Sequence, residues 1–433
     1  MKKNKIFLFI IEKLNKSDFS KNVFTLVTGT AIAQIIPLLV APILSRIYTP
    51  QEFGRLALYM SIVQILGAIA NGRYELAIVL PKEKKKGVQL TILSISISII
   101  VSIIVLFVVL LFSNTIANAL GDPKLDKWLF LVPISVLMIG CFNALNYFNT
   151  REKAFKNIAK ANIFKSLGGS ITQLSLGLLK LTGEGLIVGQ AFSHFFGNIK
   201  MGKTFLNNKE IIKSTTTKDL IKLAKRYVDF PKFSMFGIFL NTASINVTNL
   251  FISSIYNLTN LGFFSIAYRY LGLPSALMGN AISQVYMQNL TSALIDKKDI
   301  FQIFKKTLYK VFIISCLFLL FGVLFVKPIF VLYLGKDWFE AGVYAQILVP
   351  LFAVRFIVSC LSITLIVLEK QRVELFVHLS ILLSTIVVLI SSTIFNLEIK
   401  ILIVLYSLVL VINYLIILLY IFLLIKKINV ERN

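Results

Sequence analysis

The chain has 433 residues, of which 57% are hydrophobic and 15% are charged. A soluble domain carries about 25% charged residues, so this composition and a mean hydropathy of +0.82 exclude a water-soluble globular protein. The net charge of +25 does not indicate a nucleic-acid partner, because the basic residues form short clusters between apolar runs and no single patch.

Residues 1–21 lack the cleavage site of a signal peptide and are expected to form an amphipathic stretch on the membrane surface. A transmembrane helix needs about 20 mostly apolar residues. Twelve such runs follow, and we predict an all-α integral membrane protein with about twelve transmembrane helices. The predicted spans are 22–45, 54–80, 88–112, 126–149, 158–180, 184–206, 233–256, 262–290, 307–331, 342–368, 374–396 and 400–425.

Connections that are rich in lysine and arginine alternate along the chain with connections that are poor in them. This alternation indicates the orientation of the spans. They concentrate in both termini and in the even-numbered connections, such as Lys82–Lys86. The seventh connection, 257–261, contains none. Because basic connections remain on the cytoplasmic side, both termini are predicted to be cytoplasmic.

The longest polar stretch, 207–232, divides the chain into an N-terminal six-helix lobe (1–206) and a C-terminal six-helix lobe (233–433). A weak internal repeat accompanies this division. Ser45, Ile47, Tyr48 and Gly54 recur at a constant offset of 208 as Ser253, Ile255, Tyr256 and Gly262. The two halves are therefore predicted to be parallel repeats.

The linker 207–232 alternates apolar residues with Lys222, Lys225 and Arg226. This pattern predicts a basic amphipathic helix on the cytoplasmic surface that is attracted to anionic lipid. Pro231 is expected to end that helix.

Three segments resemble those of bacterial polysaccharide flippases of the Wzx type: LSRIYTPQEFG (44–54), NGRYELAIVLP (71–81) and YVDFPKF (227–233). That family belongs to the multidrug/oligosaccharidyl-lipid/polysaccharide exporter superfamily, with the MATE transporters and the lipid II flippases. The resemblance covers the whole chain in layout. It implies two lobes around a central cavity that opens alternately to each side of a bacterial cytoplasmic (inner) membrane.

The resemblance also implies a cargo, a polyprenyl-diphosphate-linked oligosaccharide for O-antigen, capsule or exopolysaccharide assembly. The expected partners are this lipid-linked oligosaccharide, membrane lipids, a polysaccharide polymerase and glycosyltransferases, and no nucleic acid. Neither a P-loop nor a metal-ligand cluster is found, and a transporter without cofactor, metal or catalytic residues is expected rather than an enzyme.

Charged residues inside predicted spans are costly and usually face a cavity or a partner. Arg355 lies about 13 residues from either end of its span, roughly 20 Å along the axis, and is the strongest candidate for a cavity cation. Arg269 and Arg73 are further candidates, although Arg269 can also snorkel and Arg73 can also fix its helix against a neighbour. Glu75 is a candidate proton or sodium site. On a continuous helix, Arg73 and Glu75 would point to opposite sides and would not pair.

Uncharged polar residues are candidates for contacts with sugar hydroxyls, or alternatively for hydrogen bonds between helices. These residues are Gln34 and Gln64 in the first half and Asn241, Asn246 and Asn249 in the seventh span. The excess of intramembrane arginine over acid favours an anionic cargo. Two alternatives stay open: an ion-coupled drug antiporter of the same architecture, and a membrane-embedded glycosyltransferase or polymerase.

Overall fold

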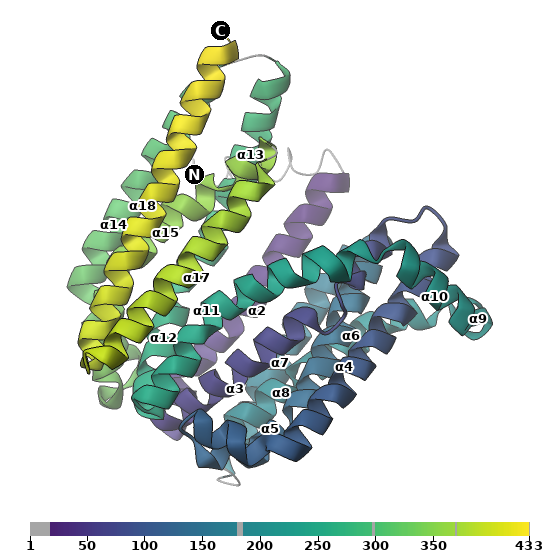
Figure 1. Ribbon diagram of the computed structural model, residues 1–433, viewed down its shortest axis with the longest axis horizontal. Helices are drawn as coiled ribbons and strands as arrows, with labels where there is room; N and C mark the ends of the chain where they lie inside the picture. The colour runs from purple at the N-terminus through teal and green to yellow at the C-terminus, as the bar shows by residue number, and fades with distance from the viewer. Residues whose placement is uncertain (1–17, 180–184, 297–298, 369, 433) are drawn as a thin grey trace, which may run out of the picture. The chain divides into compact units, whose positions relative to one another are not determined.

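The computed structural model describes residues 18–179, 185–296, 299–368 and 370–432 (Figure 1). All regular structure in these ranges is helical, which confirms the predicted all-α class. The amphipathic stretch expected at the N-terminus falls almost entirely on residues 1–17, outside the described part of the chain.

The predicted spans of the first half fall mainly on helix, with a break in the second. These helices are α2 (Asp18–Ile47), α3 (Pro50–Ile69), α4 (Lys84–Ala119), α6 (Val132–Arg151), α7 (Phe155–Leu178) and α8 (Gly185–Leu206). The short η2 (Pro123–Leu125) and α5 (Asp126–Leu129) connect α4 to α6.

The spans of the second half also fall on helix. They are α11 (Met235–Ile255), α12 (Leu258–Pro274) with α13 (Asn280–Ile295), α14 (Ile300–Leu334), α15 (Phe339–Leu361) with α16 (Ile363–Val367), α17 (Gln371–Ile394) and α18 (Ile399–Arg432). Within the described residues, nine helical segments are long and apolar enough to cross a membrane. The more polar α7 and α8 and the short α12 are not among those nine. The chain is a multi-pass membrane protein.

The second predicted span departs from expectation. Helix α3 ends at Ile69, and residues Tyr74–Val79 form a separate 3₁₀ helix, η1. Between them Gly72 has a φ of 57° and Arg73 a φ of 64°. Two successive left-handed residues cannot continue a right-handed helix. The prediction of one continuous helix over 54–80 is therefore wrong.

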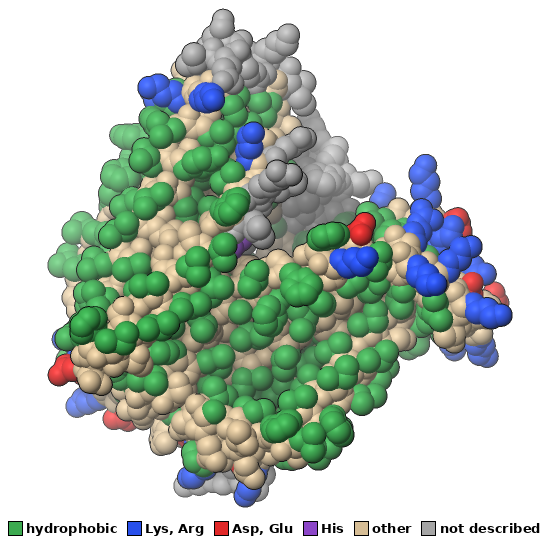
Figure 2. Space-filling view, viewed as in Figure 1, with side chains coloured by type: hydrophobic (Ala, Val, Ile, Leu, Met, Phe, Trp, Pro, Cys, Tyr) green, Lys and Arg blue, Asp and Glu red, His purple; other side chains and the backbone are tan. Residues whose placement is uncertain are grey.

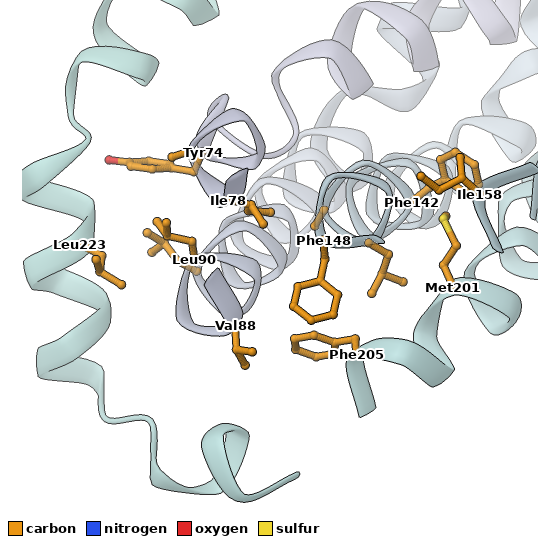
Figure 3. Packing of buried hydrophobic residues seen from close by; sticks show 14 of the residues in the cluster. Tyr74, Ile78, Val88, Leu90, Phe142, Phe148, Ile158, Met201, Phe205 and Leu223 are labelled. Atoms are coloured by element: carbon orange, nitrogen blue, oxygen red, sulfur yellow. The ribbon is translucent and has the colours of Figure 1, made fainter. Parts of the chain in front are cut away.

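One compact unit comprises the described residues up to Tyr48 together with Ile62–Ala119 and Pro123–Phe239. Within it α7 packs against α2 and α8, and α4 packs against α6. Its core includes Phe148 and Phe205, whose rings meet edge to face with centroids 5.4 Å apart (Figure 3). Burying such aromatic side chains supplies much of the packing energy of a helical unit.

The linker belongs to this first unit. It forms α9 (Lys209–Ser214), α10 (Thr217–Arg226) and the π-helix η3 (Phe230–Ser234). Leu223 of α10 is buried in the core of the unit, on the side where Figure 3 shows Tyr74 and Leu90. The predicted amphipathic helix thus uses its apolar side for protein packing and ends at Arg226, before Pro231. Its lysines face outward, in the basic cluster over α9 and α10 in Figure 2.

The second compact unit comprises Thr49–Ser61, Leu120–Asp122 and the chain from Leu240 onward. Helix α15 packs against α12, α14 and α18, and α17 packs against α18. After Pro274 the α12 helix gives way to a π-helix, η4 (Ser275–Gly279), because proline removes one backbone donor. This unit carries the candidate site.

Candidate functional site

Arg355 lies on α15 and is held by aromatic side chains. Its Nη1 donates a hydrogen bond to the Tyr268 hydroxyl of α12 at 2.6 Å. The guanidinium carbon lies 5.5 Å from the centre of the Tyr268 ring and 5.6 Å from that of Phe352. Both distances are within cation–π range. These contacts fix the guanidinium in one orientation without neutralising its charge.

Arg355 lines a cavity of about 310 Å³ inside the second unit. The cavity lies between α11, α12, α15, α17 and α18, and its lining alternates apolar side chains with hydroxyl, amide and imidazole groups. The polar lining residues are Asn241, Ser244, Tyr268, Arg355, Ser359, Ser362, His378, Thr385, Tyr406 and Tyr414.

Arg355 forms no ion pair with any carboxylate in the described part of the chain. Tyr268, Tyr406 and Tyr414 contribute phenol groups to the lining of the same cavity. A guanidinium has five N–H donors, and Tyr268 accepts only one hydrogen bond from it. The arrangement can therefore bind an anion, and oxyanions with two acceptor oxygens match the guanidinium best.

Arg73 and Glu75 form a second polar site, in the first unit. Arg73 Nη1 lies 3.1 Å from Glu75 Oε1, so the prediction that the two residues do not pair is wrong. The turn before η1 replaces the helix on which that prediction rested. Glu75 is only 2% exposed, and its second oxygen, Oε2, has no hydrogen-bond partner.

The Arg73 site joins one segment that carries the family resemblance, 71–81, to residues on either side of another, 227–233. Arg73 Nε donates to the Ser234 hydroxyl at 3.3 Å, and the Tyr74 hydroxyl donates to the Ala224 carbonyl at 3.0 Å. Segment 71–81 is thereby fixed against the end of the linker and the start of α11. These bonds explain why a short 3₁₀ helix with a buried acid is stable here.

The other candidates of the first unit and Arg269 are not among the residues that line the cavity around Arg355. Arg269 is exposed on α12, adjacent in sequence to Tyr268 but not in the cavity lining. Gln34 is half-buried on α2, with Oε1 enclosed and without a hydrogen-bond partner. Gln64 is exposed on α3.

The three asparagines of α11 have different surroundings. Asn241 lines the cavity. Asn246 is buried and donates to the Thr242 carbonyl of its own helix at 2.9 Å. Asn249 donates to the Ser61 hydroxyl of α3 at 2.9 Å. Of the three asparagines, one thus lines the cavity, while the other two hydrogen-bond within the unit.

Several cavity residues were not predicted from the sequence, among them Tyr406, Tyr414, His378 and Thr385. A signal exists on α18, where Tyr406, Leu410 and Tyr414 recur every four residues and so share a face. Across the described ranges, no three His, Cys, Asp or Glu side chains gather as a metal ion would require.

The fold has been seen in solved structures. An inward-facing multidrug resistance MATE family transporter of the MOP superfamily matches with a TM-score of 0.65 and 13% identity, over 94% of this chain and 95% of that one. The lipid II flippase MurJ, in an inward closed conformation, matches with a TM-score of 0.68 and 15% identity, over 95% of this chain and 90% of that one. At these identities the likeness shows the fold alone.

A third match is a MOP superfamily transporter from Pyrococcus furiosus, with a TM-score of 0.59 and 13% identity over 97% of this chain and 98% of that one. No curated protein matches the sequence. The sequence profile of a family described as "Polysaccharide biosynthesis protein" matches residues 43–343, which is more than half of the chain. The chain therefore belongs to this polysaccharide biosynthesis protein family and has the fold of the MOP superfamily.

Proposed function

We propose that the protein is a flippase that moves polyprenyl-diphosphate-linked oligosaccharide units across the cytoplasmic membrane by alternating access, for O-antigen, capsule or exopolysaccharide assembly. The observation that carries this proposal is that Arg355 lines a cavity and donates a hydrogen bond to the phenol of Tyr268 and to no described carboxylate. Membership of a polysaccharide biosynthesis family supports a glycan cargo.

The chemistry of the cavity suits a diphosphate. Arginine stays charged even when desolvated, and its planar fork matches phosphate oxygens. The hydroxyls of Ser359, Ser362 and Thr385 add neutral donors and acceptors on the same lining. A lysine would be a weaker choice, because burial lowers its proton affinity.

The size of the cavity limits what it binds. A volume of about 310 Å³ lies at the lower end of the roughly 300–1,000 Å³ of small-molecule sites. The cavity therefore accommodates the diphosphate and the adjoining sugar, while the polyprenyl chain stays in lipid. Distal sugars lie outside it, so this site recognises the charged end of the cargo and tolerates variation in the glycan.

Glu75 is the proposed ion site among the acids of the first unit, with Arg73 as its partner. A carboxylate with one paired and one unpartnered oxygen, buried from water, can take up a proton or a sodium ion. Arg73 and Arg269 remain proposed contacts of the cargo, together with Gln34, Gln64, Asn246 and Asn249.

A drug/cation antiporter of the same architecture is the second candidate. A cavity that binds cationic drugs more often contains carboxylates, whereas among the described residues the polar lining around Arg355 contains a cation and no acid. The charge of this cavity therefore favours the anionic cargo.

Substitution of Arg355 tests the proposal. Purified protein is reconstituted into liposomes, and the translocation of a diphosphate-linked oligosaccharide is followed by its accessibility to an added glycan-modifying enzyme. Arg355→Ala should slow translocation at least tenfold, since a charge-assisted hydrogen bond contributes about 1.5–3 kcal/mol. Arg355→Lys should retain part of the rate.

Lys400→Ala is the matched control, because Lys400 is an exposed cation of the same unit and is absent from the cavity lining. It should leave the rate unchanged. Equal rates for Arg355→Ala and the wild type, with both proteins equally folded in detergent, would refute a cationic cavity for the cargo.

A further inference from the structure

The first unit contains a pair of basic side chains near the middle of two adjacent helices. Lys165 lies near the middle of α7, and His194 lies near the middle of α8. Between them is Phe142, near the middle of α6: Lys165 Nζ lies 4.8 Å from its ring centre, and the His194 ring meets it edge to face at 5.4 Å. The three residues therefore share one level of the helix bundle.

No carboxylate neutralises this pair. Lys165 forms no ion pair with any described acid, and its described interaction is the contact with Phe142. Helix α2, which packs along α7, has no charged residue over 22–45. On α8 the nearest lysine in sequence, Lys200, contacts Phe164 at 5.9 Å. Lys165 and His194 thus have the Phe142 ring as a common neighbour.

The hydrogen bonds around His194 indicate which ring nitrogen can accept a proton. The Ser193 hydroxyl donates to the Gln190 carbonyl at 2.7 Å, so its single hydrogen is already used. His194 Nδ1, which lies 3.3 Å from the Ser193 oxygen, must then be the donor of that contact. In this tautomer Nε2 carries the free lone pair and is the atom that takes up a proton.

Two adjacent basic groups in an apolar environment resist carrying two charges. Each cation costs several kcal/mol at the membrane centre, and two like charges that contact the same aromatic ring titrate as a coupled pair. The pair therefore holds one positive charge or none. Both side chains are only partly covered by the protein.

We propose that Lys165 and His194 form a proton-binding site in the first unit, and that its loading and unloading couples a proton gradient to transport. One proton adds to the neutral pair, at Lys165 Nζ or at His194 Nε2, and the charge of the site rises from zero to +1. This inference rests on the proposed transport function but not on the identity of the cargo.

The test uses the full-length protein in liposomes that contain a pH-sensitive dye. Translocation of the diphosphate-linked oligosaccharide and proton flux are measured together, with and without an imposed proton gradient. In the wild type the gradient should accelerate translocation, and proton flux should accompany it. In Lys165→Met and His194→Gln, translocation down the substrate gradient should continue, but the response to the proton gradient should be lost.

Lys165→Arg separates proton exchange from structural support. Arginine preserves the cation over Phe142 but does not release its proton. If Lys165 exchanges a proton, Lys165→Arg should lose the gradient response as Lys165→Met does. If the cation only stabilises the bundle, Lys165→Arg should behave as the wild type and overturn the proposal. Lys160→Met, an exposed lysine of the same helix, is the matched control and should keep the full response.

The remaining outcomes are also decisive. A wild-type protein without any gradient response, or variants that retain it, would refute the proton site while leaving the flippase proposal intact. Proton flux that depends on Lys165 in a protein that never translocates the oligosaccharide would support the proton site and refute the proposed cargo.

Discussion

Gly54 of α3 and Gly262 of α12 lie where two helices cross in backbone contact. A Cβ at Gly54 would overlap the Leu258 carbonyl, and a Cβ at Gly262 would overlap the Pro50 carbonyl. At the offset of 208 found in the internal repeat, Gly54 corresponds to Gly262 and Pro50 corresponds to Leu258. The contact of Gly54 with Leu258 is therefore repeated as the contact of Gly262 with Pro50. The repeated glycines thus face each other in a reciprocal contact, which gives the repeat a physical reason.

Replacing either glycine should destabilise the protein. Gly54→Ala or Gly262→Ala forces a methyl group into a backbone carbonyl that cannot move aside, at a cost of about 1–3 kcal/mol or more. The melting temperature in detergent should fall for both variants. Gly202→Ala, within α8 and with nothing near the added Cβ, is the control and should be neutral or slightly stabilising. Equal melting temperatures for all three variants would contradict the contact.

Arg55 and Asp122 form a buried ion pair at 2.5 Å in the second unit, with side chains only 7% and 4% exposed. Removing one partner leaves a buried charge uncompensated, so Asp122→Ala should cost about 3–5 kcal/mol. The double variant Arg55→Met/Asp122→Leu should recover much of that loss. Thermal unfolding of Arg55→Met, of Asp122→Leu and of the double variant measures the coupling, and strictly additive effects would show that the pair contributes little.

The Arg73 turn can be tested through its backbone. Because Arg73 has a φ of 64°, a β-branched residue is strained there. Arg73→Val should therefore lower the melting temperature more than Arg73→Asn, since asparagine tolerates the left-handed region. Both variants lose the ion pair with Glu75, so their difference isolates the backbone. The opposite order would contradict the left-handed conformation.

The linker should respond to acid through Asp219. The Thr216 backbone N–H and hydroxyl donate to the Asp219 carboxylate and hold its pKa below the usual range. A lowered folded-state pKa means that this capping interaction is present above the unfolded-state pKa and is lost as the pH falls through the folded-state value. The protection factors of the amides in the first turn of α10, which compare their exchange with that of an unfolded chain at the same pH, should fall over that acidic window. Asp219→Asn should exchange faster at neutral pH and lack the transition, whereas a transition that persists in Asp219→Asn would exclude this carboxylate as its cause.

Most of the fold could be predicted from the sequence because a membrane helix is marked by an apolar run of fixed length. The break after Ile69 could not, since Asn71, Gly72 and Arg73 do not interrupt the apolar pattern enough to end a span. Only the positive φ values of Gly72 and Arg73 show that the chain turns there. The pairing of Arg73 with Glu75 follows from that turn.

The candidate site was predictable in part. The depth of Arg355 along its span follows from counting residues, and that count does not depend on the packing of helices. The identity of the residues around Arg355 does depend on how the helices pack. Tyr268 comes from α12 and Tyr414 from α18, and no local sequence pattern predicts which faces of those helices meet. Long-range contacts of this kind lie beyond what helical periodicity can predict.

The central claim, an anionic lipid-linked cargo, is tested most directly by comparing cargoes of opposite charge on the same protein. Liposomes containing the wild-type protein are supplied either with a polyprenyl-diphosphate-linked oligosaccharide or with a lipophilic drug cation, and the translocation of each is measured. The account predicts that the diphosphate-linked oligosaccharide is translocated and that Arg355→Ala slows it, while the cation is not transported. Transport of the cation, with no translocation of the diphosphate-linked oligosaccharide, would contradict the account.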